Sequence, residues 1–365
     1  MPMPCITRKL TWSAAAVAAL ALLAAACGGG EESPAQQTPT ASGPASCPSA
    51  ENAGKLVLTP TTADYFPAVV SSDSDLAVGP NRFVVGLLDS SQAPVSGAQL
   101  HFRFFCVTES GDKLFKSEAD AKAITIQKSF THTHTDGTVE SHAAGELGVY
   151  VTNVDFDSPG LWGVEVSGTL NGEDLETQAP VFVVREESLS PAIGDPAPPS
   201  VQPLLKDVAD ITQIDTSDPP NPAMHQMTIA DAVKSGKPSV IVFATPAFCI
   251  SQVCGPTKSV VDELFAKYQG QANFIHVEPY FIPEARSGKG LCLLPIMNLQ
   301  IASQPSQGCP QIAAADLPPA GQSWNLETEP WVFIVDAQGK IAGKFEAVVS
   351  YDELEQALEP LLARG

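Results

Sequence analysis

The chain has 365 residues, enough for two ordinary domains, and carries 20 Lys and Arg against 41 Asp and Glu, a formal net charge of −21. This acidic balance argues against a nucleic-acid-binding protein, because phosphates require a basic surface. A hydrophobic content of 44% supports at least one sizeable core. The 32 Pro and 27 Gly exceed what two compact domains need, so part of the chain is expected to be linker.

The N-terminus has the pattern of an export signal. Arg8 and Lys9 form a positively charged region, and an apolar run rich in Ala follows over residues 10–23. The run is short for a transmembrane helix. We therefore expect the folded part of the protein to lie outside the cytoplasm.

The residues that close this signal, Ala24-Ala25-Ala26-Cys27-Gly28, resemble a bacterial lipoprotein signal, although Ala24 stands where that motif more often has Leu. The resemblance implies removal of residues 1–26 and a lipid on Cys27. It also implies anchoring to the cell membrane or outer envelope, facing the periplasm or the extracellular side. The alternatives are a secretory signal cut near Ala26, or a membrane helix that is never cut.

Residues 27–50 are almost devoid of large apolar side chains, so they cannot repay the entropic cost of ordering and are expected to form a disordered tether. If residues 1–26 are removed and Cys27 is lipidated, six cysteines remain. An even number in an oxidising compartment favours disulfides, with 15 connectivities open.

Residues 51–185 are expected to form an all-β domain. Runs of β-forming residues recur between turn sequences at 55–58, 81–89, 98–107, 145–156, 161–168 and 178–184. Many short strands without a helical pattern predict a β-sandwich. Gly148-Val149-Tyr150 and Pro159-Gly160-Leu161-Trp162 also resemble the later strands of immunoglobulin-like domains in extracytoplasmic bacterial proteins, some of which accompany copper handling.

Residues 186–225 contain many prolines and are predicted to be a linker without regular structure. Residues 226–365 then alternate strand and helix patterns. Strands are expected at 239–244, 273–277, 331–335 and 341–345, and helices at 256–268 and 351–362. This order predicts an α/β domain with a mixed sheet and helices on both of its faces.

Cys249 and Cys254 stand at the turn from the strand 239–244 into the helix 256–268. Near a helix N-terminus, unpaired amides and the helix dipole stabilise a thiolate and lower its pKa. Such a thiolate is abundant at neutral pH and is a good leaving group, as disulfide exchange requires. The alternative is a fixed disulfide that staples the loop.

Motifs on both sides of this pair resemble membrane-anchored thioredoxin-like proteins of the TlpA and ResA kind, and more distantly the SCO proteins and peroxiredoxins. They are GDPAP at 194–198, GKP at 236–238 leading into SVIVFAT, and TEPWVFIVDAQGK at 328–340. The resemblance covers about residues 191–363 and implies a thioredoxin-like fold, with Pro330 as a cis-proline facing the cysteines. It implies thiol-disulfide exchange with a protein substrate and a membrane electron donor, and no cofactor is expected.

Four residues separate Cys249 from Cys254, whereas thioredoxins have two and SCO proteins three between their cysteines. Pro246 stands where peroxiredoxins have Thr or Ser, which argues against a peroxidase. The last hairpin lacks the histidine that SCO proteins use for copper. Cys249 is favoured as nucleophile and Cys254 as resolving cysteine, but the position of Cys254 beside Gly255-Pro256 leaves the reversed assignment open.

The other cysteines are expected to be structural. Cys292 and Cys309 lie in a long proline-rich insertion, residues 283–322, which a disulfide between them would close. Cys47 and Cys106 remain as a pair that would tie the tether to a strand. Cys106 also alternates with Phe102 and Phe104, so simple burial is the alternative.

A histidine cluster is the other candidate site. His132 and His134 share a face if they lie on a strand, and with His142 they could bind copper or zinc. The alternative is an exposed polar hairpin. Three functions follow from these observations: an anchored thiol-disulfide oxidoreductase, a copper-binding module that uses the thiols or the histidines, and a non-catalytic surface-binding lipoprotein with a structural disulfide.

Overall fold

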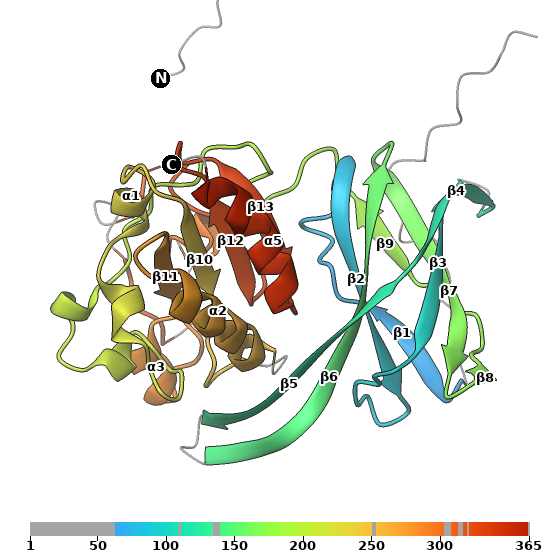
Figure 1. The fold of residues 1–365 in the computed structure, drawn as a ribbon, viewed down its shortest axis with the longest axis horizontal. Helices are drawn as coiled ribbons and strands as arrows, with labels where there is room; N and C mark the ends of the chain where they lie inside the picture. The colour runs from blue at the N-terminus through green and yellow to red at the C-terminus, as the bar shows by residue number, and fades with distance from the viewer. Residues whose placement is uncertain are drawn as a thin grey trace, which may run out of the picture. The chain divides into compact units, whose positions relative to one another are not determined.

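The computed structural model describes residues 63–108, 111–133, 139–249, 253–302, 308–312, 317–319 and 321–363. These ranges belong to one compact unit of the chain, Ser46–Gly365. The predicted signal, the tether, Cys27, Cys47 and the strand expected at 55–58 lie outside the described residues. Three sheets account for most of the described secondary structure, so the fold is rich in β-structure (Figure 1).

Two of the sheets are antiparallel and are built from the first half of the described chain. The first has the order β1 (Tyr65–Val69), β2 (Gly79–Asp89), β6 (Val139–Phe156), β5 (Lys122–Thr133). The second has the order β4 (Lys113–Asp120), β3 (Gln99–Val107), β7 (Gly160–Leu170), β8 (Glu173–Asp174), and β9 (Val181–Val184) also pairs with β7.

These two sheets share an aromatic core. Strand β3 alternates buried Phe102 and Phe104 with the more exposed His101 and Arg103, as the period of a half-buried strand requires. The ring of Phe83 on β2 lies 5.1 Å from that of Phe104. Each fully buried ring of this size contributes roughly 1.5–3 kcal/mol, so this core is a main source of stability.

Four strands in this half were not predicted from sequence: β1, β4, β5 and β8. Strand β4 reads KLFKSEAD, is largely exposed and lies at the edge of its sheet. An edge strand without a continuous buried face gives only a weak hydrophobic pattern.

The third sheet is mixed and has the order β11 (Asn273–Val277), β10 (Ser239–Phe243), β12 (Trp331–Val335), β13 (Ile341–Glu346). Strand β10 is parallel to β11 and antiparallel to β12. All five residues of β10 are buried, because layers cover both faces of the sheet.

The layers on the two faces differ. Helices α2 (Cys254–Tyr268) and α5 (Tyr351–Leu362) pack on the face that carries Val240 and Val242. The opposite face, with Ile241 and Phe243, is covered by the short helix α1 (Ile229–Ala232) and by irregular chain around Trp324. Helices were expected on both faces, and the second face has more loop than helix. Two further short helices, α3 (Ile282–Arg286) and α4 (Leu299–Ala302), lie in the proline-rich insertion.

The segment 186–225, predicted to be a linker, contains three short 3-10 helices: η2 (Leu205–Asp207), η3 (Ile211–Gln213) and η4 (Pro222–His225). Several of its side chains are buried, among them Asp215, Thr216 and His225. Prolines exclude longer helices and strands here, but the segment packs against the third sheet. Ala197 and Met224 belong to the buried clusters on the two faces of that sheet.

Polar contacts join the antiparallel sheets to the third sheet. The Arg82 guanidinium on β2 lies 2.8 Å from Glu353 on α5 and donates to the Val348 carbonyl at 2.7 Å. Lys344 on β13 lies 2.7 Å from Asp75. Apolar side chains of β5 and β6 also belong to the same buried cluster as α2: Ile124, Ile126, Val149 and Val151.

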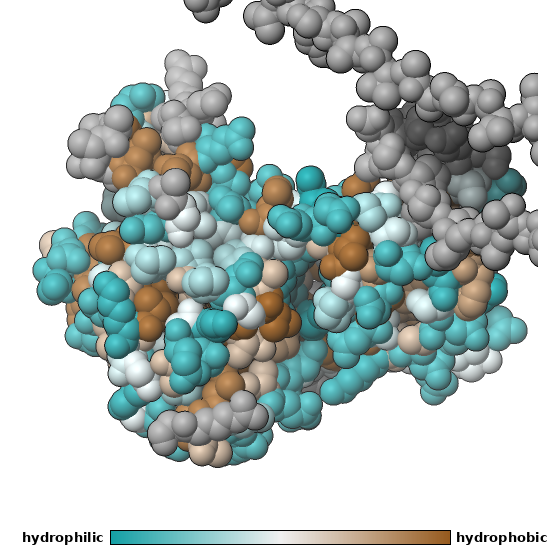
Figure 2. Space-filling model, turned by 90° about the horizontal axis from the view of Figure 1, so that it is seen from above, coloured by the Kyte–Doolittle hydropathy of each residue, from teal (hydrophilic) through white to brown (hydrophobic). Residues whose placement is uncertain are grey.

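Hydrophilic residues predominate on the face shown in Figure 2, as the acidic composition leads one to expect, with hydrophobic residues in small groups between them. Within the described ranges, no helix is both long and apolar enough to cross a membrane.

Candidate functional site

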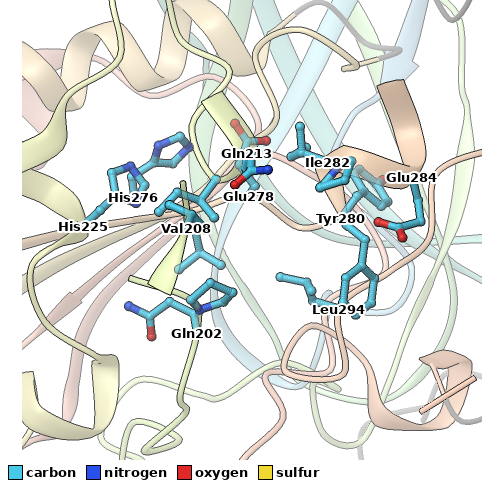
Figure 3. A pocket seen from close by; sticks show the side chains of 15 residues that line it. Gln202, Val208, Gln213, His225, His276, Glu278, Tyr280, Ile282, Glu284 and Leu294 are labelled. Carbon is cyan, nitrogen blue, oxygen red and sulfur yellow. The ribbon is translucent and has the colours of Figure 1, made fainter. Parts of the chain in front are cut away.

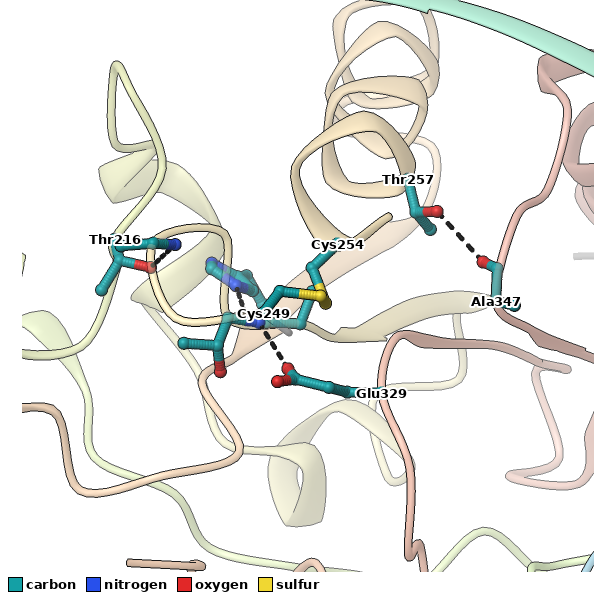
Figure 4. The surroundings of a disulfide bond; sticks show 10 residues. Thr216, Cys249, Cys254, Thr257, Glu329 and Ala347 are labelled. Atoms are coloured by element: carbon teal, nitrogen blue, oxygen red, sulfur yellow. Dashed lines mark hydrogen bonds between the residues drawn. A yellow bond between two sulfur atoms is a disulfide. The ribbon is translucent and has the colours of Figure 1, made fainter. Parts of the chain in front are cut away.

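Cys249 and Cys254 form a disulfide with an S–S distance of 2.19 Å and a Cα–Cα distance of 6.0 Å (Figure 4). Cys249 ends the described part of the loop that follows β10, and Cys254 is the first residue of α2. Cys254 is completely buried, whereas 7% of Cys249 is exposed. A reagent in solution therefore reaches Cys249 more readily than Cys254.

Helix α2 begins two residues before the start at Pro256 that the sequence predicts, so Cys254 lies within its first turn. The free amides of that turn and the helix dipole stabilise a negative charge on the Cys254 sulfur. Thr257 anchors the same turn, because its hydroxyl donates to the Ala347 carbonyl at 3.0 Å (Figure 4).

A carboxyl group lies beside the disulfide. A carboxylate oxygen of Glu329 and the two sulfur atoms all lie within 4.8 Å of one another. Glu329 precedes β12, and its peptide bond to Pro330 is cis. The Thr245 amide, in the loop that leads to Cys249, donates to Glu329 Oε2 at 2.8 Å and fixes the carboxyl group at the sulfur atoms.

The environment of Glu329 favours its protonated form. Burial, with repulsion from Glu278 as a further cause, raises the pKa of Glu329 to about 8. Burial likewise raises the pKa of Glu278 above its ordinary value. At neutral pH the Glu329 carboxyl therefore holds a proton next to the disulfide, where a departing thiolate needs one.

A second polar cluster lies between strand β11 and the 186–225 segment. Asp215 follows η3, His225 ends η4 and His276 is on β11, and all three side chains are buried. His225 Nε2 lies 3.0 Å from Asp215 Oδ2, and His276 Nδ1 lies 3.5 Å from Asp215 Oδ1. The three groups could hold a metal ion, because one ligand atom of each lies within 4.8 Å of the others.

The three groups of this cluster differ in how their surroundings shift their pKa values. Burial opposes ionisation of Asp215, but the charge of His276 and a hydrogen bond from His225 hold the pKa of Asp215 well below its usual range. Burial lowers the pKa of His225. Burial acts in the same direction on His276, but Asp215 outweighs it and raises the pKa of that imidazole.

The two histidines border a cavity of about 190 Å³ between β11 and the 186–225 segment (Figure 3). Glu278 and Tyr280 also face it, and most of its remaining lining is apolar, including Val208, Ile282 and Leu294. The cavity provides space for a water molecule or a small ligand at the edge of the cluster.

Thr216, next to Asp215 in the chain, connects the surroundings of the Asp215–His225–His276 cluster to the loop that carries Cys249. Its backbone amide donates to Glu278, and its hydroxyl accepts from the Ala247 amide at 3.1 Å, in the loop that carries Cys249. The predicted linker thus supports the disulfide loop.

The remaining predicted site residues are placed as follows. Cys292 and Cys309 form a disulfide with an S–S distance of 2.11 Å. Cys106 is also disulfide-bonded, to a partner outside the described residues, so its pairing with Cys47 stays a prediction. His132 on β5 pairs in register with Glu140 on β6.

His142 pairs in register with Phe130, and the side chains of His132 and His142 are not described. His134 lies outside the described residues altogether. The metal site predicted from these three histidines therefore stays a prediction.

Sequence reasoning missed Glu329, Asp215, His225 and His276. The signal for Glu329 was its position before Pro330 at the start of a wholly apolar strand, where a charged residue is out of place. The other three lie far apart in the chain and carry no common motif. Neither a protein-family model nor a curated protein matches the chain.

Proposed function

We propose that this protein is an exported, lipid-anchored thiol-disulfide oxidoreductase whose reacting group is the Cys249–Cys254 disulfide. The observation that carries the proposal is the position of this disulfide between a buried strand and the first turn of α2, with the Glu329 carboxyl beside it. A disulfide that only stapled the loop would need neither a helix N-terminus nor a protonated acid at its sulfur atoms.

The proposal includes the fold. We assign residues 226–365 to a thioredoxin-like domain, and the antiparallel sheets of residues 51–185 to an immunoglobulin-like one. The order β10-α2-β11 followed by β12-β13-α5 and the mixed sheet support the first assignment. The shared aromatic core of the antiparallel sheets supports the second.

In the oxidising direction, the exchange begins when a thiolate of the substrate protein attacks Cys249 Sγ, which is the more exposed sulfur. A mixed disulfide to Cys249 forms and the Cys249–Cys254 bond breaks. Cys254 leaves as a thiolate that the α2 N-terminus stabilises, and it then takes a proton from Glu329. A lower pKa of the leaving thiol speeds this step.

The second thiol of the substrate, as its thiolate, then attacks the substrate sulfur of the mixed disulfide. Cys249 leaves with the electron pair and is protonated from solvent, Glu329 regains its own proton from solvent, and the substrate holds a new disulfide. Two electrons and two protons have passed from the substrate dithiol to the protein. A membrane-bound dithiol or disulfide partner would restore the starting state, and the reverse sequence reduces a substrate disulfide.

Trapping of the mixed disulfide tests this function. In the reducing direction, Cys249 of a Cys254→Ser variant still attacks a substrate disulfide, but no Cys254 is present to resolve the mixed disulfide. The variant should therefore accumulate covalent, thiol-reducible complexes with envelope proteins. Cys292→Ser is the matched control, because it leaves a single thiol, Cys309, from a disulfide that closes a loop. A Cys254→Ser protein that traps no more partner than Cys292→Ser would contradict the proposal.

A copper-binding function is the second candidate, because the two sulfur atoms and a Glu329 oxygen lie close enough to bind one ion once the disulfide is reduced. Thiolates favour Cu(I). Titration of the reduced protein with Cu(I) decides between the functions. Binding at sub-micromolar concentration that Cys249→Ser removes would favour the copper module.

A further inference from the structure

We propose that Asp215, His225 and His276 form a binding site for one divalent cation of the zinc class, separate from the cysteines. The site joins η4, the loop after η3 and strand β11, and it opens toward the cavity of about 190 Å³ (Figure 3). It goes beyond the proposed exchange function and does not depend on it.

The spacing of the three groups fits one metal ion. Two ligands at the usual zinc distances of about 2.0–2.2 Å in a tetrahedron lie about 3.3 Å from each other. His225 Nε2 lies 3.0 Å from Asp215 Oδ2 and His276 Nδ1 lies 3.5 Å from Asp215 Oδ1, on either side of that value, and one ligand atom of each residue lies within 4.8 Å of the other two. Small side-chain adjustments would direct all three groups at a common ion.

His276 has the arrangement of a metal ligand. Its Nε2 hydrogen bonds with the Ala244 carbonyl at 2.9 Å, so Nε2 carries the hydrogen and donates it. Metal-bound histidines usually donate their other N–H in this way. Among the described residues, Nδ1 of this fully enclosed ring makes no hydrogen bond, although it is directed at Asp215.

The contact of Nδ1 with Asp215 Oδ1, at 3.5 Å, is longer than a normal hydrogen bond, and burial of a polar atom without a hydrogen bond costs about 1–3 kcal/mol. A cation bound between Nδ1 and Asp215 supplies the missing partner. Glu278 Oε2, on the cavity wall, is a second buried atom without a hydrogen bond in the described structure.

The aspartate is held in position by its own surroundings. Asp215 accepts backbone N–H bonds from Ser217 and Asn221, both at 2.9 Å. The buried ammonium of Lys258 is engaged by Asp262 at 2.7 Å. Asp215 therefore offers its negative charge to a cation from a fixed position.

The ligand types select the metal. Two imidazoles and one carboxylate suit Zn²⁺, whereas Mg²⁺ and Ca²⁺ prefer all-oxygen sites and Cu(I) prefers sulfur. Three protein ligands leave one position open on the cavity side, where a water molecule or the Glu278 carboxylate would complete a tetrahedron. The competing interpretation is a metal-free Asp–His pair that only joins η4 to β11.

Zinc titration of the full mature chain tests the site. The protein is stripped of metal with a chelator and kept oxidised, so that all disulfides are closed and no thiol binds zinc. We expect one Zn²⁺ per chain with a sub-micromolar dissociation constant, and a visible absorption spectrum of four-coordinate cobalt when Co²⁺ replaces zinc.

Variants locate the ion. His225→Ala and His276→Ala should each weaken zinc binding at least about 100-fold, more than loss of an outer partner does. His101→Ala is the matched control, because His101 is an exposed histidine that also pairs with an aspartate, Asp120 at 2.7 Å. It should leave binding unchanged. A Cys249→Ser/Cys254→Ser variant should also keep the ion, which separates this site from the proposed exchange site.

The proposal is overturned if the oxidised wild-type protein binds no zinc at micromolar concentration. This result needs no variant, so a folding defect in His225→Ala or His276→Ala cannot obscure it. Binding that persists in both histidine variants, or that is lost in a His132→Ala/His134→Ala/His142→Ala variant instead, would place the ion elsewhere and also overturn it.

Discussion

In the proposed exchange reaction, Glu329 is the proton donor beside the disulfide. Its carboxyl is fixed by the Thr245 amide at 2.8 Å and lies within 4.8 Å of both sulfur atoms. Burial is the main cause that raises the pKa of Glu329 to about 8, and repulsion from the neighbouring Glu278 is the next. The group is thus protonated at neutral pH and can donate to the thiolate that leaves.

Glu329→Gln should slow reduction of the Cys249–Cys254 disulfide by a small dithiol about 10- to 100-fold at pH 7, because it removes the proton donor. In the wild type this advantage should fade as the pH rises through about 8 and Glu329 loses its proton. Stopped-flow kinetics from pH 6 to 9 measure both effects. Glu327→Gln, at an exposed neighbour, should behave as wild type. Equal rates for Glu329→Gln and wild type at all pH values would show that Glu329 takes no part.

Glu329 should also make stability depend on pH. Because its pKa in the folded state, about 8, exceeds the ordinary value of 4.5, the favourable contribution of the neutral acid is complete below about pH 4.5. It is then lost as the pH rises through 8. Urea unfolding at pH 5, 7 and 9 should show this decline in the wild type and a smaller one in Glu329→Gln. A parallel decline in both proteins would contradict the assignment.

At the scale of elements, close approach between β3 and β7 places a strict demand on one residue. Gly168 has φ +147°, and a Cβ atom there would lie 1.9 Å from the Gln99 carbonyl oxygen. Backbone atoms cannot yield to such a contact as a flexible side chain can, so the pairing of the two strands depends on glycine.

Gly168→Ala should therefore destabilise the protein by more than about 4 kcal/mol or prevent folding. Gly172→Ala is the matched control, since Gly172 also has a positive φ, +85°, but a Cβ there meets no atom within 4 Å. It should cost only about 1–2 kcal/mol. Urea unfolding followed by circular dichroism compares the two variants, and similar losses in both would show that the contact with Gln99 is unimportant.

Elements with a strong pattern could be predicted from sequence. Strand β10 is a continuous apolar run because both its faces are buried, and α5 has an apolar stripe that includes Leu354 and Leu358. Strand β4 could not be predicted, because at its exposed edge position few of its side chains need to be hydrophobic.

Some residues of the candidate sites could likewise be predicted from sequence, and others could not. Cys249 and Cys254 could be found because they are near in sequence to a strand and a helix. Asp215, His225 and His276 could not, since only the packing of the 186–225 segment against β11 brings them together. That packing depends on tertiary contacts, and the proline-rich sequence of the segment has no local pattern that would predict them.

At the scale of the whole molecule, an enclosed ion pair couples the antiparallel sheets to the third sheet. Side chains of Arg82 and Glu353 are only 11% and 17% exposed, and Arg82 also donates to the Glu346 and Val348 carbonyls. Burial opposes ionisation of Glu353, but Arg82 outweighs it and holds the pKa of Glu353 below its ordinary value. The pair thus remains charged at neutral pH.

Arg82→Ala should lower the free energy of unfolding by about 3 kcal/mol, because it leaves Glu353 buried without its partner. The contribution of the pair should be present above about pH 4.5, the ordinary pKa of a glutamate, and should be lost as the pH falls. Arg103→Ala breaks two ion pairs near the surface, with Glu118 and Glu165, and should cost less than about 1 kcal/mol for each. Equal losses from both substitutions in urea unfolding would argue against coupling through Arg82.

The reduction potential of the Cys249–Cys254 pair tests the central claim most directly. The oxidised protein is equilibrated in graded dithiothreitol and glutathione buffers, its free thiols are trapped, and the labelled peptides of this pair are quantified by mass spectrometry beside those of Cys292–Cys309. A thiol-disulfide oxidoreductase should give a potential above about −300 mV for Cys249–Cys254 and a lower one for Cys292–Cys309. A value well below −300 mV for Cys249–Cys254 would identify it as a structural staple and contradict the proposed function.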